Sequence, residues 1–149
     1  DPYAFDNRRS INTMVSDKQF VTRVEQTLPK GAAIFQLPYM DFPEPQVRYG
    51  TMVTYEPMSL YLYSHNLDWS YGATSGRDVD RWNRVTSSQP VKAMLAKLKS
   101  AGYGSIIIDT YGYQDKGEGL IHELGVELRE SPLISLDHHY VFYPIVVNK

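Results

Sequence analysis

Apolar residues recur along the chain at helical and at strand spacing, and the two patterns alternate. The first helical stripe consists of Phe20, Val21, Val24 and Leu28. Ser16 lies before this stripe, and Gln19 follows it three residues later, which is the spacing of a capping box. We therefore expect a helix over residues 17–27 that begins at Ser16.

Two apolar runs predict the main strands of a sheet. Residues 32–37 form a short run that ends at a proline. Ser105–Asp109 is apolar at consecutive positions, which is typical of a strand covered on both faces. Between them, residues 79–85 and 91–98 carry apolar stripes at helical spacing, the second between Pro90 and a glycine.

The remaining elements are shorter. Residues 47–55 indicate an edge strand, and residues 58–63 are ambiguous between a helix and a strand. We expect a short helix over 120–124 that ends at Gly125. Near the end of the chain, residues 133–136 and 140–146 predict a β-hairpin.

This order of elements predicts an α/β fold, in which a mixed sheet is flanked by helices and followed by a C-terminal β-hairpin. Helices separate the strands that contain Ile34 and Ile107, so we expect those strands to be parallel. We expect residues 1–149 to form one domain, because no linker or internal repeat divides the chain. Residues 1–15 lack a clean period and are interpreted as a lead-in.

Composition excludes several classes of protein. The net charge is −2, with 15 basic and 17 acidic side chains, so we expect no nucleic-acid partner. The chain has no cysteine, which excludes disulfides, cysteine nucleophiles and Cys-type zinc sites. No apolar run reaches the roughly 18 residues of a membrane span. Since the chain begins at Asp1 rather than Met and no signal peptide is visible, we interpret it as a piece of a longer protein or as a processed form.

Histidines give no support for a metal site. His65 and His122 lack partners at ligand spacing, and His138 and His139 fall in the predicted hairpin turn, where exposure to solvent is expected. We expect neither a metal nor another cofactor.

The stretch from Ser64 to Trp82 concentrates polar and aromatic groups in a region without a clear period. It contains both tryptophans of the chain. Such a loop either binds a ligand or uses these groups to hold itself together, and the sequence leaves both alternatives open.

The two main strands end in similar polar loops. Ligands of open α/β sheets bind beyond the carboxyl ends of parallel strands, so we expect the side chains that follow these strands to meet there. The expected neighbours are Gln36, Tyr39, Asp41, Glu44, Asp109, Tyr111, Tyr113 and Asp115. If residues 60–63 form a third strand, Ser64, His65 and Asn66 join them, and the loop around Trp69 covers the site.

Each candidate has an alternative interpretation. Asp109 is a functional carboxylate, a partner of Arg77 or Arg81 in an ion pair, or the cap of the turn after it. With Asp41, Glu44 or Asp115 it has the chemistry of a glycosidase acid/base pair. Trp69 and Tyr71 stack on a sugar ring or simply pack in the loop, and Arg77 binds a phosphate or carboxylate or forms a structural ion pair.

Three long motifs carry a resemblance to a known family. They are SDKQFVTRVEQTLPKGAAIFQLPYMDFPE, LYSHNLDWSYGATSGRDVDRW and LKSAGYGSIIIDTYGYQDKG. Together they resemble the C-terminal region of bacterial multi-pass membrane glycosyltransferases. The resemblance covers about Ser16 to Ile145, and it implies an extracytoplasmic location, with residues 1–15 leading in from membrane helices of the same parent chain.

The resemblance favours a non-catalytic domain that binds a glycan, a lipid-linked sugar or a sugar-phosphate, or that supports the membrane part. The expected binding residues are Ser64, Asn66, Trp69, Tyr71, Arg77, Asp109, Tyr111 and Tyr113. The alternatives are a stand-alone carbohydrate-active hydrolase with Asp109 and Glu44 as its acid/base pair, and a purely structural assembly domain.

Overall fold

The computed structural model describes part of the chain in detail. Its backbone is described over residues 2–29, 31–39, 48–49, 52–53, 68–69 and 77–145. Side chains are described over residues 11–29, 31–39 and 81–145.

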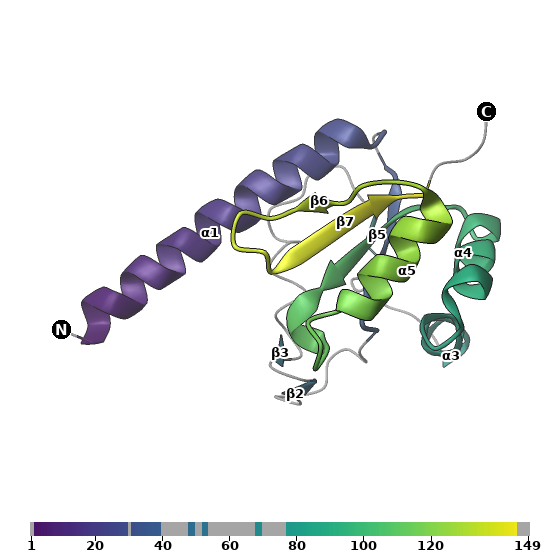
Figure 1. Ribbon diagram of the computed structural model, residues 1–149, viewed down its shortest axis with the longest axis horizontal. Coiled ribbons are helices and arrows are strands. Elements are labelled where there is room, and N and C mark those ends of the chain that lie inside the picture. Colours follow the sequence, from purple (N-terminus) through teal and green to yellow (C-terminus); the bar gives the residue numbers. More distant parts are fainter. Residues whose placement is uncertain are drawn as a thin grey trace.

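The centre of the molecule is an open mixed sheet of five strands in the order β4-β1-β5-β7-β6 (Figure 1). Its strands are β1 (Ala33–Leu37), β4 (Asp68–Trp69), β5 (Tyr103–Asp109), β6 (Leu133–Ile134) and β7 (Tyr140–Pro144). Strands β4, β1 and β5 are parallel, whereas β7 is antiparallel to both β5 and β6. The predicted α/β fold, the parallel pairing of the two main strands and the C-terminal hairpin are confirmed.

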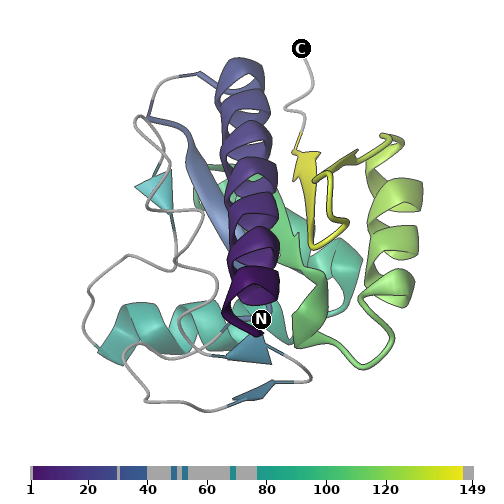
Figure 2. The same cartoon turned by 90° about the vertical axis from the view of Figure 1, so that its left-hand side faces the viewer.

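Helices cover both faces of this sheet. They are α1 (Pro2–Thr27), α3 (Arg77–Ser87), α4 (Val91–Ser100) and α5 (Glu118–Leu128), with a 3₁₀ turn, η2 (Thr110–Gly112), directly after β5. Of the described helices, α1 lies on one face, and α3, α4 and α5 lie on the other (Figures 1 and 2).

Alternate side chains of β5 build the two halves of the core. Ile106 and Ile108 join Phe35 and the apolar stripe of α4. Ile107 points to the opposite face, where it joins Phe20 and its neighbours on α1. A strand buried on both faces has to be apolar at consecutive positions, which explains the run in the sequence.

Helix α1 begins much earlier than predicted. The prediction took Ser16 as the first cap, but the helix starts at Pro2, and Ser16 lies in its middle with a buried side chain. The hydroxyl of Ser16 accepts a hydrogen bond from the amide of Asp137, 3.2 Å away on the β6–β7 turn. The serine at this position makes a tertiary contact. The capping-box pattern in the sequence does not distinguish such a serine from one that begins a helix.

The first half of α1 extends beyond the sheet. Among the described side chains of α1, those buried toward the sheet begin at Ser16, and residues 2–15 before them make up about 21 Å of helix at 1.5 Å per residue. Because α1 is followed by a short connection and by β1, its first half projects past the carboxyl ends of β1 and β5 (Figure 1). Ile11, Met14 and Val15 in this half are exposed.

Helix α5 is also longer than predicted, since it continues through Gly125 to Leu128. A Cβ at Gly125 would lie 3.2 Å from the hydroxyl of Tyr143, which donates a hydrogen bond to the carbonyl of Ile121. The glycine therefore allows α5 to lie close to β7. The helix ends instead at Arg129, which adopts a left-handed backbone with φ of 55°.

The expected edge strand over residues 47–55 is a separate small hairpin. Strands β2 (Arg48–Tyr49) and β3 (Met52–Val53) pair only with each other, and β2 lies next to η2. The ambiguous segment 58–63 lies outside the described residues. Across the described part of the chain, no helix is long and apolar enough to span a membrane.

A matched pair of substitutions tests the docking of α1. Val21 is 1% exposed and Val15 is 55% exposed on the same helix. We expect Val21→Ala to lower the free energy of unfolding by about 2 kcal/mol, from the lost burial of two methyl groups and the cavity left behind.

Val15→Ala is the control, because both changes raise helix propensity equally. Its free energy of unfolding, measured by urea denaturation, should stay within about 0.5 kcal/mol of the original. Equal losses in both variants would contradict the described packing.

Candidate functional site

Asp109 lies where β5 ends, and its side chain is buried on the face that α1 covers. Its Oδ1 accepts a hydrogen bond of 3.0 Å from the backbone amide of Tyr111 and thereby caps η2. One of the alternatives considered for Asp109, the cap of the following turn, is therefore confirmed. The ionic partner that the structure gives Asp109 is a histidine, and the side chain of Arg77 lies outside the described residues.

That partner is His139, whose Nε2 lies 2.8 Å from Oδ1 of Asp109. The prediction that both turn histidines are exposed is correct for His138 but wrong for His139, which is 7% exposed. The reason is the antiparallel register, which pairs Asp109 with Tyr140 and so brings the preceding residue beside the end of β5.

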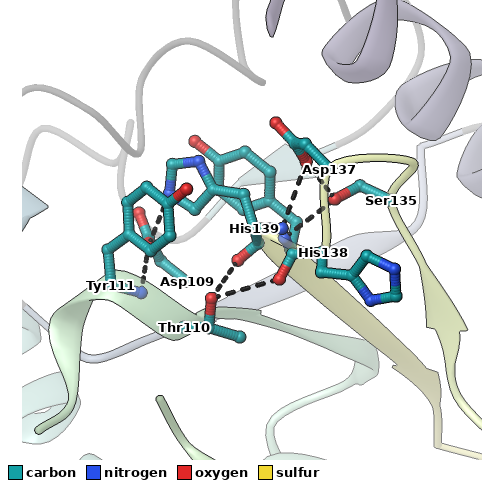
Figure 3. A network of polar contacts seen from close by, with 8 residues as sticks. Asp109, Thr110, Tyr111, Ser135, Asp137, His138 and His139 are labelled. Atoms are coloured by element: carbon teal, nitrogen blue, oxygen red, sulfur yellow. Dashed lines mark hydrogen bonds and ion pairs between the residues drawn. The ribbon is translucent and has the colours of Figure 1, made fainter.

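The ring of His139 stacks against two tyrosine rings, and Figure 3 shows it beside the ring of Tyr111. The centroid of Tyr111 lies 3.8 Å away on one side, and that of Tyr140 lies 4.0 Å away on the other, with all three rings close to parallel. Tyr140 in turn stacks on Phe20 of α1 at 5.9 Å. This aromatic column connects the end of β5 to the helix that covers the sheet.

Thr110 fixes the backbone beneath this column. Its amide and its hydroxyl both donate to the carbonyl of His139, at 2.9 and 2.8 Å. His138 adopts a left-handed backbone with φ of 60°, which turns the chain so that the next side chain points inward. The histidine position is thus set by backbone contacts as well as by its ring.

The β6–β7 turn is held by a second group of hydrogen bonds. Oδ1 of Asp137 accepts from the hydroxyl of Ser135 at 2.7 Å and from the amide of His139 at 3.1 Å. Partial burial favours a higher pKa for Asp137, but these donors, the Ser16 hydroxyl and the nearby His139 together hold its pKa below the ordinary value.

One atom of this network has no partner. Oδ2 of Asp109 is buried and receives no hydrogen bond. Buried carboxylate oxygens normally have donors, so this oxygen is a candidate acceptor for a hydrogen bond from a ligand. The adjoining ring of Tyr111 is half-buried, so one neighbour of this carboxylate reaches the surface.

Other predicted residues lie at the same edge of the sheet. Gln36 is buried on the α1 face near the end of β1, and Tyr39 is half-buried just beyond it. Asp115 accepts the amides of Gly117 and Gly119 and so holds the start of α5. Tyr113 packs against the core on the face of α4 and α5. Its pKa is raised mainly by burial and, to a smaller extent, by the negative charges of Asp109 and Asp115.

Two predicted residues are not brought to Asp109. Trp69 pairs with Ile34 at the level of Ser105, so its backbone lies about 13 Å short of Asp109 along the strands. Arg77 begins α3, which belongs to the layer on the opposite face. The other predicted residues lie outside the described ranges: Asp41, Glu44, Ser64, His65, Asn66 and Tyr71.

A shallow hollow of about 390 Å³ lies far from this edge, between α3 and the end of α4. Its lining consists of Trp82, Ala96, Lys97, Ser100 and Ala101. The Trp82 ring stacks on Tyr103, 6.0 Å away, so the tryptophan has a structural role in the core.

The described residues contain no group of three or more His, Asp or Glu side chains that could hold a metal ion. Comparison with models of known protein families, with curated proteins and with solved structures gives no match for this chain. Any functional conclusion therefore depends on the site itself.

The lowered pKa of Asp137 predicts how the turn responds to acid. A carboxylate with a depressed folded pKa stabilises the fold above its unfolded pKa, near 3.9, and this contribution disappears as the pH falls through the folded value. We expect Asp137→Asn to lower the melting temperature at pH 7 and to reduce its decline below about pH 4.

Melting curves of both proteins between about pH 2.5 and pH 7 test this expectation. Glu127→Gln is the control, because it removes one acidic charge from an exposed position on α5. Parallel melting-temperature profiles for Asp137→Asn and the unaltered chain would contradict the role given to these hydrogen bonds.

Proposed function

We propose that this chain is the extracytoplasmic domain of a membrane-embedded sugar transferase, and that it binds a glycan or sugar-phosphate at the carboxyl edge of its parallel strands. The observation that carries the proposal is the buried Asp109 with one unpaired carboxylate oxygen beside the half-buried ring of Tyr111. Open α/β sheets bind their ligands at this edge.

The chemistry of the two side chains fits a sugar. The carboxylate oxygen accepts hydrogen bonds from hydroxyl groups, and it is held in one orientation because Oδ1 is occupied by Tyr111 and His139. A tyrosine ring presents a flat apolar surface to the C–H face of a sugar. In this proposal the domain binds and orients, and the reaction takes place in the membrane part of the parent protein.

The resemblance to membrane glycosyltransferases supports the location, and the direction of α1 agrees with it. The first half of α1 projects from the carboxyl edge, on the side where Asp109 lies. If membrane helices precede α1, this arrangement turns the binding site toward the membrane surface. A lipid-linked sugar would then approach from that side.

Asp109→Asn tests the carboxylate. The amide keeps the shape of the side chain but presents an N–H₂ group to one of its neighbours, so we expect glycan affinity to fall about ten-fold or more. Isothermal titration calorimetry against a panel of soluble oligosaccharides and sugar phosphates measures the change. Glu127→Gln is the control with the same loss of charge, and equal affinities for Asp109→Asn and the control would remove Asp109 from the site.

Trp69→Ala tests whether the central stretch contributes to the same site. We expect weaker glycan binding, since an aromatic ring contributes stacking and burial, with little change in the melting temperature. The backbone of Trp69 lies well short of Asp109. The experiment therefore tests whether the Trp69 side chain contributes to the binding site at the carboxyl edge of the sheet. Unchanged binding in calorimetry would exclude Trp69 from the site.

A second candidate is a stand-alone carbohydrate-active hydrolase that uses Asp109 and Glu44. The observation in its favour is the imidazole of His139 within 2.8 Å of Asp109, since histidine is the side chain that most often transfers protons. Turnover of a chromogenic glycoside by the isolated chain, abolished by Asp109→Asn, would favour the hydrolase over the binding domain.

A further inference from the structure

The outer surface of helices α3 and α4 is basic, although the chain as a whole has a net charge of −2. The two helices contain six basic residues and two acidic ones, and both acidic residues lie in the first turn of α3. Residues 81–101 therefore contain no acidic side chain. The five basic side chains in this range are all exposed, namely Arg81, Arg84, Lys92, Lys97 and Lys99.

The hollow of about 390 Å³ between α3 and the end of α4 lies within this basic surface. Its volume falls in the range of small-molecule sites. Three of its lining residues, Ala96, Ser100 and Ala101, are small and leave the space open. Trp82 and Lys97 complete the lining with an apolar surface and a positive charge.

The indole of Trp82 is held by two aromatic neighbours. Its ring stacks on Tyr103, with the centroids 6.0 Å apart, and forms an edge contact with Phe35 at 6.3 Å. Trp82 is half-buried, so the part of its side chain that lines the hollow is presented in a fixed orientation. A side chain that is fixed before binding loses little conformational entropy when a ligand arrives.

The charge at the hollow favours an anion. The C-terminal end of a helix carries a partial charge of about −0.5, but α4 has Lys97 and Lys99 in its last turn. The carbonyls of both lysines already accept hydrogen bonds, from the amides of Ala101 and Gly102. The ammonium group of Lys97 therefore outweighs the helix end, and a carboxylate in the hollow would form a charge-assisted hydrogen bond with it.

A sugar with a carboxylate group matches this combination. The C–H groups of a sugar ring pack on indole, and its hydroxyl groups exchange hydrogen bonds with a serine such as Ser100. A uronate also supplies the carboxylate that pairs with lysine. A flat bilayer fits less well, because the hollow is concave and the Trp82 ring, packed against the core, is not free to enter the lipid.

We infer that the hollow between α3 and α4 binds a uronate residue of an acidic glycan, with Trp82 against the sugar ring and Lys97 against the carboxylate. Tyr103, on which Trp82 stacks, begins β5, and Asp109 ends it, so the hollow lies about 20 Å from the carboxyl edge. The inference therefore concerns a second site and does not depend on the proposed function.

An NMR titration of the unaltered chain with matched ligands tests the inference. The probes are the methyl glycosides of glucuronic and galacturonic acid, compared at pH 7 with those of glucose and galactose, which carry a CH₂OH group in place of the carboxylate. We expect at least one uronide to shift the indole N–H signal of Trp82 and the amide signals of Lys97 and Ala101. Its affinity should be about five-fold higher than that of its neutral counterpart.

Matched variants on α4 separate the charge of the hollow from its shape. Lys97→Gln should weaken uronide binding about five-fold, whereas Lys92→Gln, which removes the same charge from an exposed position outside the lining, should change it by less than about two-fold. Ala96→Leu fills the hollow and should abolish detectable binding. Ala93→Leu is its control, because it makes the same change at an exposed position of α4 outside the lining.

Several outcomes would overturn the inference. They are absence of binding by both uronides, equal affinities for a uronide and its neutral counterpart, and equal losses in Lys97→Gln and Lys92→Gln. Shifts confined to residues 109–111 would place the uronide at the carboxyl edge instead. Shifts of the Trp82 signal by phosphatidylglycerol vesicles but by neither uronide would indicate a membrane surface instead. If Ala96→Leu fails to fold, which its melting curve would show, the lysine pair still decides.

Discussion

Strand β5 has to be covered on both of its faces, and the arrangement of the other elements follows from that constraint. Ile106 and Ile108 face α4 and α5, whereas Ile107 faces α1. A strand of this kind cannot lie at a solvent-exposed surface without a large loss of apolar burial. The described elements therefore form three layers, with β5, the longest of the described strands, in the centre of the sheet between β1 and β7.

The end of the same strand is where the apolar core changes into a polar network. Asp109 and His139 are both buried, and a buried charge is tolerated only when it is paired and hydrogen-bonded. The tyrosine rings on either side of the histidine exclude water while contributing favourable ring contacts. The carboxyl edge thus contains a buried polar pair with one unpaired carboxylate oxygen. For this reason it is a better candidate site than the hollow beside Trp82.

The network also connects segments that are distant in the sequence. Ser16 on α1 meets the turn that contains Asp137, and Thr110 after β5 binds the backbone of His139. Displacement of any one of these segments would disturb the others, because each supplies hydrogen bonds that the next one needs. The site is consequently coupled to the docking of α1 and not only to the loops around it.

Local periodicity in the sequence determined the elements whose stability is mostly local or whose burial is extreme. The stripe of α4 and the two-sided apolar run of β5 are readable from neighbouring residues, and the capped turn at Asp109 is one of the alternatives that those residues leave open. Parallel pairing of β1 and β5 followed from the helices between them. The tertiary structure alone decided the early start of α1, the passage of α5 through Gly125 and the burial of His139. Each of these depends on a partner far away in the chain, namely the β6–β7 turn for Ser16, Tyr143 for Gly125 and the end of β5 for His139. A pattern of neighbouring residues contains no information about such partners, so the meaning of these three residues appears only when the sheet is assembled.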